Sequence, residues 1–429
     1  MALKKKPVTG MKDILPGEME IRDYVLNIIK DTYRGYGFSA IETPCVEHIE
    51  NLTSKQGGDN EKLIFKILKR GEKLNVEAAQ TEADVVDGGL RYDLTLPLSR
   101  YYANNSANLS APFKALQVGS VWRADRPQKG RFRQFVQCDI DILGDATNLA
   151  EIEEILALTK ALKRICPDKA YTVRVNDRAI LKGMADYSGF PENETDKVFI
   201  ILDKMDKIGL DGVREELLAE GYAPEAVEKY TGLLAEIQND AAGVRALGEK
   251  LSGVMDPAKA ENLATIMETV KAVADIEFGL EFDPTLVRGM GYYTGTIFEI
   301  KSDDFKGSSI AGGGRYDNMI GSFTGTPTCA CGFSIGFERL VGALLDKKFR
   351  AEGGREKVAV LYGKAFAAAD VAALQCRCNA LRESGKIVLC QRMNKNLGFQ
   401  KQKLEAQGYT VFVDVRTPEE AADKLADRT

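Results

Sequence analysis

Charged, aromatic and amide side chains recur at alternate positions from Val121 to Gly144 (VWRADRPQKGRFRQFVQCDIDILG). Side chains alternate between the two faces of a strand, so residues of the same parity share a face. The central Arg-Pro-Gln-Lys-Gly has the composition of a turn, and the stretch therefore predicts a hairpin. A near-symmetric turn would place both odd-numbered sets on one surface. That surface would consist of Val121, Arg123, Asp125, Arg131, Arg133, Phe135, Gln137, Asp139 and Asp141.

The mixture of side chains on this predicted surface indicates a ligand site. An apolar core would not hold it, because unpaired buried charge is costly. A solvated hairpin face is the simplest alternative for a run of charges. However, guanidinium groups suit phosphate, a ring suits a base, and Gln with Asp suits a small polar ligand that bears an ammonium group.

A second pair of polar residues occurs in Leu90–Arg100 (LRYDLTLPLSR). Asp93 and Thr95 lie two positions apart, so on a strand they would point the same way and could accept hydrogen bonds from an ammonium group. The alternative is that they cap a helix that begins near Pro97.

Composition limits the class of protein. The chain has 429 residues, enough for two or three domains, and its 44% apolar and 28% charged residues are ordinary for a globular protein. It contains no apolar run of about 18 residues, so no membrane span is predicted. The start, MALKKKPVTG, lacks the apolar segment of a secretory signal, and we expect a cytoplasmic protein.

Cysteine and histidine usage argues against a metal centre. None of the eight cysteines forms a CxxC pair, and the chain has one histidine, His48. We expect reduced thiols and no metal site made from protein side chains alone. The net charge of −5 gives no global attraction to nucleic acid, so any RNA contact must use local basic patches.

The remaining stretches predict the elements that position these residues. A helix is expected from Met19 to Tyr36, followed by a strand, FSAIETP, that ends at Pro44. Residues 177–276 are helical and poor in strands. Gly312–Gly314 is expected to be a flexible turn that approaches a ligand, without the pattern of a dinucleotide-binding loop. Alternating helices and strands after residue 356 predict a small α/β domain.

Three separated segments resemble one family. The hairpin resembles motif 2 of a class II aminoacyl-tRNA synthetase, in its histidyl-tRNA synthetase form. Leu286–Glu299 (LVRGMGYYTGTIFE) resembles the histidine-binding motif of that family, and Gly312–Leu340 resembles its motif 3 region. The likeness covers roughly residues 7 to 345, and the motifs occur in the family's order.

The resemblance implies an α+β fold. A class II antiparallel-sheet catalytic domain would occupy residues 1–345, with a helical insertion at about 177–276. A linker at 346–356 would lead to a shortened, anticodon-binding-like α/β domain at 357–429. The helix and strand that end at Pro44 resemble motif 1, which builds the family's homodimer interface.

The implied activity is ATP-dependent charging of tRNA(His) with L-histidine through a histidyl-adenylate, with Mg2+ as cofactor. An alternative is the family's non-charging paralogue, the regulatory subunit of ATP phosphoribosyltransferase in histidine biosynthesis. A synthetase for another amino acid is a third possibility.

The resemblance also implies roles for individual residues. Arg288 and Arg123 would be catalytic, and Gln128 would meet the tRNA acceptor end. Histidine would be surrounded by Asp93, Thr95, Gln137, Asp141, Arg288, Tyr292 and Tyr293. ATP would be bound by Arg123, Asp125, Arg131, Phe135 and Arg339. Because consecutive strand residues face opposite ways, we expect only one of Tyr292 and Tyr293 to reach deep into the pocket.

Three departures from the family pattern are visible. Gly291 stands where an aspartate is usual, which removes a carboxylate beside the histidine pocket. Val136 replaces an aromatic residue or histidine; it should face away from the site and change packing only. Met393–Asn396 replaces the usual basic loop of the last domain, so we expect that domain to contribute less to RNA binding.

Overall fold

The computed structural model describes residues 3–53, 62–128, 130–288, 292–305, 309–347, 349 and 355–426. The chain forms two compact units. One comprises residues 1–12 and 25–343, and the other comprises residues 13–24 and 344–429.

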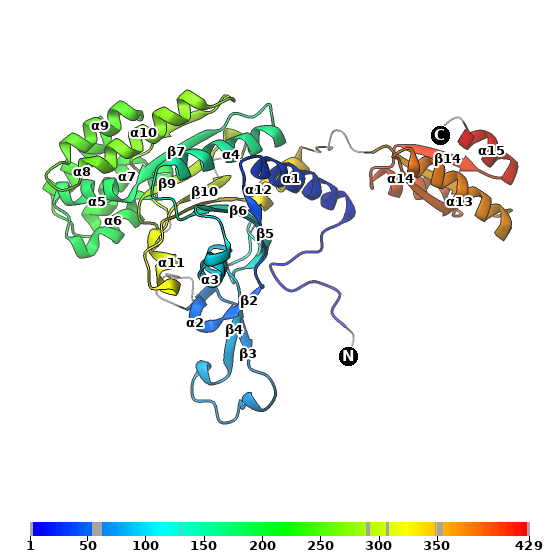
Figure 1. Cartoon of the computed structure of the whole chain (residues 1–429), viewed down its shortest axis with the longest axis horizontal. Helices are drawn as coiled ribbons and strands as arrows, with labels where there is room; N and C mark the ends of the chain where they lie inside the picture. The colour runs from blue at the N-terminus through cyan, green and yellow to red at the C-terminus, as the bar shows by residue number, and fades with distance from the viewer. Residues whose placement is uncertain are drawn as a thin grey trace. The chain divides into compact units, whose positions relative to one another are not determined.

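An eight-stranded sheet forms the centre of the first unit (Figure 1). Its internal pairs are antiparallel, and only the outermost pairs, β1 with β5 and β7 with β8, are parallel. This agrees with the predicted α+β class. The spatial order is β1 (Ser39–Ala40), β5 (Phe113–Trp122), β6 (Gln134–Leu143), β11 (Ala330–Ile335), β10 (Ala311–Arg315), β9 (Thr296–Lys301), β7 (Thr172–Asp177) and β8 (Gly279–Phe282). The strand expected to end at Pro44 is only the two residues of β1.

The central hairpin has the predicted register. Val121 lies opposite Phe135, and Gly119 lies opposite Gln137, so odd-numbered residues of β5 and β6 share a face. The paired strands stop at Trp122 and resume at Gln134, so the arginines at 123, 131 and 133 belong to the connection. The Arg133 side chain donates from Nε to the Asp125 carbonyl at 3.0 Å, and Arg133 is not among the residues that line the pocket described below.

Helices cover the sheet and carry polar residues to its edges. α4 (Leu149–Ile165) packs on β11 and buries Ile152, Ile155, Leu158, Leu162 and Ile165, which recur at helical spacing. The other helices outside the insertion are α1 (Pro16–Gly35), α3 (Thr95–Asn105), α11 (Asp317–Thr324) and α12 (Phe337–Asp346), together with α2 (Ile49–Leu52), which packs on a second sheet. This second sheet has the order β2 (Val46–His48), β4 (Val86–Leu90), β3 (Lys66–Leu68).

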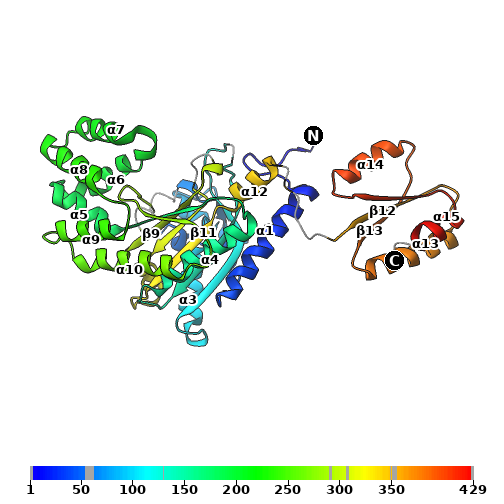
Figure 2. The same ribbon diagram turned by 90° about the horizontal axis from the view of Figure 1, so that it is seen from above.

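The helical insertion leaves the sheet after β7 and returns at β8, as a group of helices beside the sheet (Figures 1 and 2). Its first helix starts where the Asp177 carboxylate accepts the Ala179 N–H at 2.8 Å, and it stops at Gly189, whose φ is 95°. Asp240 and Asp256 cap two further helices in the same way. The helices are α5 (Arg178–Ser188), α6 (Thr195–Leu202), α7 (Met205–Ala219), α8 (Pro224–Glu236), α9 (Ala241–Lys250) and α10 (Pro257–Val273).

The second unit contains a three-stranded parallel sheet, in the order β13 (Ile387–Arg392), β12 (Lys357–Tyr362), β14 (Val411–Val415). Even-numbered β12 residues pack under α13 (Ala368–Glu383) and α15 (Pro418–Ala426). Odd-numbered ones pack under α14 (Leu397–Glu405), on the opposite face (Figure 2). This alternation of buried residues is expected of a sheet that is covered by helices on both faces.

Among the described helices of the whole chain, none has the length and apolarity needed to cross a membrane.

Candidate active site

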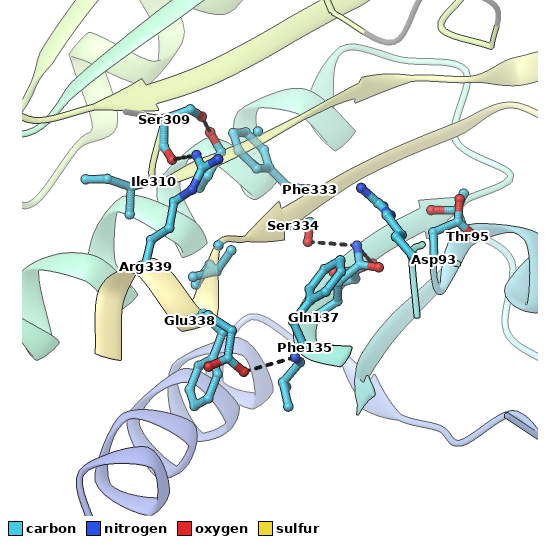
Figure 3. Close-up of a pocket in the computed structure, with 18 of the residues that line it drawn as sticks. Asp93, Thr95, Phe135, Gln137, Ser309, Ile310, Phe333, Ser334, Glu338 and Arg339 are labelled. Carbon is cyan, nitrogen blue, oxygen red and sulfur yellow. Dashed lines mark hydrogen bonds between the residues drawn. The ribbon is translucent and has the colours of Figure 1, made fainter. Parts of the chain in front are cut away.

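One pocket of the first unit, a cavity of ≈ 530 Å³, brings together nearly all the residues singled out in the sequence. Its lining includes Asp93, Thr95, Arg123, Asp125, Arg131, Phe135, Gln137, Asp141, Arg288, Tyr292, Tyr293 and Arg339. Figure 3 shows Asp93 and Thr95 on one side, Arg339 and Ser309 on the other, and Gln137 with Ser334 between them. Gln128 is not part of the lining; it is exposed in the hairpin turn.

Acceptor groups line one end of the pocket. Gln137, Asp139 and Asp141 alternate along β6 and point to the cavity. Asp141 accepts a hydrogen bond from the Tyr316 hydroxyl at 2.6 Å. Burial raises the pKa of Asp141 to about 7, partly offset by the Tyr316 hydrogen bond. Burial, reinforced by the Asp141 charge, also holds the pKa of Asp139 well above its usual range.

The expectation that Asp93 and Thr95 lie on a strand was wrong. Thr95 is the first residue of α3 and Leu94 is its N-cap residue, while the Asp93 carboxylate accepts the Leu96 N–H at 3.1 Å, the kind of hydrogen bond that the capping alternative predicted for Asp93. The helix begins at Thr95 and not near Pro97. Both side chains still line the pocket, because the turn into α3 opens onto it. Burial raises the pKa of Asp93.

Both tyrosines contribute to the pocket, which corrects the expectation that only one would reach it. Tyr292 and Tyr293 precede β9, which starts at Thr296, so strand alternation does not apply to them. Their hydroxyl oxygens lie 3.1 Å apart and their ring centres 4.4 Å apart. Gly291 lies outside the described residues.

The guanidinium groups of Arg131, Arg288 and Arg339 lie at the opposite end of the pocket. The Arg288 guanidinium donates to Glu299 Oε1 at 3.0 Å and to Ser309 Oγ at 3.3 Å, and Arg339 donates to the Ser309 carbonyl at 2.6 Å. Burial and the neighbouring charges of Arg131 and Arg288 lower the pKa of Arg339. Like charges held this close repel, so this end of the pocket suits a polyanion that neutralises them. Glu299, the partner of Arg288, was not identified from the sequence.

Arg123 lies in the pocket wall between the acceptor end and the cationic end. Its Nε donates to the Tyr92 carbonyl at 2.8 Å, and its guanidinium carbon lies 5.3 Å from the centre of the Phe135 ring. The guanidinium is thereby held beside an aromatic face in the pocket wall. Asp125 lies 4.0 Å from Arg131 at the same edge.

Gly312–Gly314 is a buried strand and not a flexible turn. It forms β10 between β9 and β11. A Cβ on Gly312 would lie 2.2 Å from the guanidinium carbon of Arg288, and one on Gly332 would lie 2.0 Å from Asp141 Oδ1. Glycine is required at both positions because functional side chains cross the strand there.

Val136 was expected to face away from the site, but it is part of the pocket lining. Its backbone N–H donates to Glu338 Oε1 at 3.2 Å, which ties β6 to the start of α12 (Figure 3). Among the described residues, no group of three His, Cys, Asp or Glu is arranged to hold a metal ion.

The sequence of this chain matches a known family and its members. The family model described as histidyl-tRNA synthetase matches residues 10–340. A histidine–tRNA ligase from Leifsonia xyli subsp. xyli is 42% identical over 435 aligned residues, which cover 99% of this chain and 98% of that protein.

Two solved structures are similar over nearly the whole chain. The histidyl-tRNA synthetase of Nostoc sp. PCC 7120 has a TM-score of 0.79 and 26% identity, covering 98% of this chain and 94% of that one. An ATP phosphoribosyltransferase regulatory subunit/histidyl-tRNA synthetase from Bacillus halodurans has a TM-score of 0.76 at 21% identity, covering 97% and 100%, a likeness of fold alone. On the family model and the full-length relative, this chain belongs to the histidyl-tRNA synthetase family.

Proposed function

We propose that this chain charges tRNA(His) with L-histidine in two steps. A carboxylate oxygen of histidine attacks the α-phosphorus of ATP, which forms histidyl-adenylate and releases pyrophosphate. The 3′-terminal ribose hydroxyl of the tRNA then attacks the histidyl carbonyl, and AMP leaves. The observation that carries this proposal is one pocket with buried acceptors at one end and guanidinium groups at the other.

At the acceptor end, we assign histidine to Asp93, Thr95, Gln137, Asp141 and the two tyrosines. The imidazole N–H would donate to Asp141, whose other contact is the Tyr316 hydroxyl. Tyr292 and Tyr293 would enclose the ring, because both line the pocket.

At the cationic end, we assign ATP to residues of the hairpin, β9–β10 and α12. Arg123 would bind the α-phosphate, and Arg131 and Arg339 the outer phosphates. Phe135 would stack on adenine with Asp125 at its edge. Arg288 would stabilise the negative charge that develops as the carboxylate attacks. Phosphoryl transfer needs positioning and charge neutralisation more than covalent help, and fixed guanidinium groups supply both.

We expect Mg2+ to enter with ATP. Of the carboxylates at or beside this end, Asp125 and Glu299 are already ion-paired with Arg131 and Arg288, and Glu338 accepts the Val136 N–H. Phosphate and water oxygens would therefore be its main ligands, as is common for Mg2+ on nucleotides. Loss of activity on chelation that Mg2+ restores would support this assignment.

The direct test of the proposed function is transfer of labelled L-histidine to tRNA(His) by the full chain with ATP. Acid-stable label on the tRNA is the expected result. No observation on this chain favours the regulatory-subunit alternative over charging.

Gln128, exposed in the hairpin turn, is our candidate contact for the acceptor end of the tRNA. Gln128→Ala should slow the transfer step and leave adenylate formation unchanged. We place the reaction in the cytoplasm, which localisation of a tagged chain would test.

We further propose that the chain acts as a homodimer through α1 and the segment around β1. β1 is an edge strand of the eight-stranded sheet, and a second copy could cover it. Light scattering at micromolar concentration should give about twice the 47.1 kDa of one chain. A mass near that of one chain would contradict the assignment.

We propose that residues 1–345 are the catalytic domain, 346–356 a linker and 357–429 a shortened anticodon-binding-like domain. Met393–Asn396, which replaces the usual basic loop, has a structural role, because Asn396 accepts the Phe399 N–H at 3.0 Å and caps α14. Ending the chain after residue 350 should raise the KM for tRNA by less than about tenfold, equivalent to about 1.4 kcal/mol. A loss of about hundredfold or more in kcat/KM, with adenylate formation intact, would show that this domain makes a larger contribution.

A further inference from the structure

Three buried oxygen atoms along β6 have no hydrogen-bond partner within the part of the chain that the structure describes. They are Gln137 Oε1, Asp139 Oδ1 and Asp141 Oδ2. Asp139 is 3% exposed and Asp141 is 2% exposed. Buried acceptors without donors are costly, and most such groups in folded proteins are satisfied. All three residues line the pocket, so a ligand that brings N–H donors would satisfy them.

The orientation of Gln137 is fixed by Asp139 and β11. The Gln137 amide donates from Nε2 to Asp139 Oδ2 at 3.3 Å and to Ser334 Oγ at 3.2 Å. Ser334 lies directly opposite Asp139 in the sheet. Because both contacts use the amide nitrogen, the Gln137 carbonyl oxygen remains for a donor from the pocket. Gln137 and Asp139 therefore present one free acceptor oxygen each.

The groups around Asp139 favour the binding of a cation. Its charged neighbours are Asp141 on the same strand, Asp93 before α3 and Arg123 in the hairpin connection. Three carboxyl groups and one guanidinium leave an excess of acidic groups in a buried site. Histidine carries a suitable cationic donor, its α-ammonium group, which has three N–H bonds to distribute.

The order of residues along β6 matches the order of groups along histidine. Same-face residues of a strand are about 6.6 Å apart, so Phe135, Gln137, Asp139 and Asp141 form a line across the pocket floor. Arg123 lies beside Phe135, at the end where the reacting carboxylate must be. Asp141 is farthest from that end and bonds Tyr316. The α-carbon follows the carboxylate, so its ammonium group falls near Gln137 and Asp139, and the imidazole falls near Asp141.

We propose that Asp139 is a further substrate-binding residue, which holds the α-ammonium group of histidine together with Gln137 and Asp93. Asp141 is then reserved for the imidazole. This inference rests on the proposed function, because it names how the same pocket holds its amino acid. The sequence placed Asp139 on the functional face, but no role was assigned to it.

The test compares three ligands against matched variants by calorimetry. L-Histidine has all the groups, histamine keeps the ammonium and imidazole groups, and 3-(imidazol-4-yl)propionate lacks only the ammonium. Asp139→Asn preserves shape and removes the charge. Asp141→Asn does the same at the imidazole position. Asp275→Asn is the control, since that carboxylate is exposed and pairs only with Lys160 among the described contacts.

Asp139→Asn should weaken binding of histidine and histamine by about tenfold or more, because a hydrogen bond to a charged group is lost. Binding of imidazolylpropionate should change by less than about twofold, because this ligand has no ammonium to lose. Asp141→Asn should weaken all three ligands, and Asp275→Asn none. A merely structural role for Asp139 would weaken all three alike.

Equal losses for all three ligands in Asp139→Asn, or no loss for any, would overturn the proposal. If the Asn variant does not fold, as judged by its thermal transition, Asp139→Ser is compared in the same way. The proposed function is checked separately by charging activity of the unchanged chain. A wild-type chain that binds histidine with this ligand pattern but does not charge tRNA would refute the function and leave the role of Asp139 intact.

Discussion

Replacing Arg288 by alanine should lower the turnover of histidine-dependent ATP–pyrophosphate exchange by about 10² or more, the scale of losing one transition-state charge contact. The guanidinium is held at the cationic end of the pocket by Glu299 and Ser309 and is always charged. It therefore needs no reorganisation when negative charge develops on the α-phosphate. The KM values for histidine and ATP should rise only moderately, because other residues hold the ground-state ligands.

The control for Arg288→Ala must separate loss of catalysis from loss of stability, because Glu299 loses its ion-pair partner in this variant. Glu299 is largely buried, with 14% of its side chain exposed, and among the described side chains its remaining ion pair would be the contact of 3.5 Å to Lys301. Some loss of stability is therefore expected in the single variant. The double variant Arg288→Ala/Glu299→Gln should recover the thermal midpoint without recovering turnover. Near-full exchange in Arg288→Ala would show that this arginine is not the catalytic cation.

Adjacent glycines of β10 should give opposite phenotypes. In Gly312→Ala the new Cβ would occupy the position of the Arg288 guanidinium, which can move because it ends a flexible side chain. Exchange turnover should fall by about tenfold or more, since a catalytic charge is displaced, with only the smaller loss of stability expected when Glu299 loses its partner. In Gly313→Ala the Cβ would lie 1.9 Å from the Gly332 carbonyl oxygen, so the backbone of the neighbouring strand must shift. Unfolding free energy should fall by about 3 kcal/mol.

Chemical denaturation and pyrophosphate exchange, measured on both variants, separate these effects. Gly312→Ala should resemble Arg288→Ala in both turnover and denaturation midpoint. Gly313→Ala should unfold at lower denaturant. If Gly312→Ala turned over at the wild-type rate, Arg288 would not depend on its position over β10.

The sequence predicted the central hairpin correctly because its signals were local. Alternation, the turn composition and the near-symmetric loop fixed the register that places Gln137 opposite Gly119 and Phe135 opposite Val121. The helical insertion and the α/β pattern of the second unit followed from periodicity in the same way.

The predictions from sequence were wrong where tertiary contacts override the local conformational preference of the residues. Consecutive glycines usually indicate a turn, yet Gly312–Gly314 form a buried strand because Arg288 and β11 occupy the space that side chains would need. Tyr292 and Tyr293 share the pocket because the backbone before β9 is irregular. Neither the pairing of Arg288 with Glu299 nor the unsatisfied oxygen of Asp139 could be inferred from spacing, since each depends on distant strands.

Histidine-dependent ATP–pyrophosphate exchange by the full chain, without tRNA, tests the proposed adenylate chemistry most directly. L-Histidine should drive exchange, and the other proteinogenic amino acids should not, because the buried acceptors of Asp141, Asp139 and Gln137 match its two donor groups. Calorimetry on the same preparation establishes whether histidine binds. A chain that binds histidine but catalyses no exchange would contradict the synthetase assignment and support a regulatory role. Exchange driven by a different amino acid would contradict the histidine assignment of the pocket.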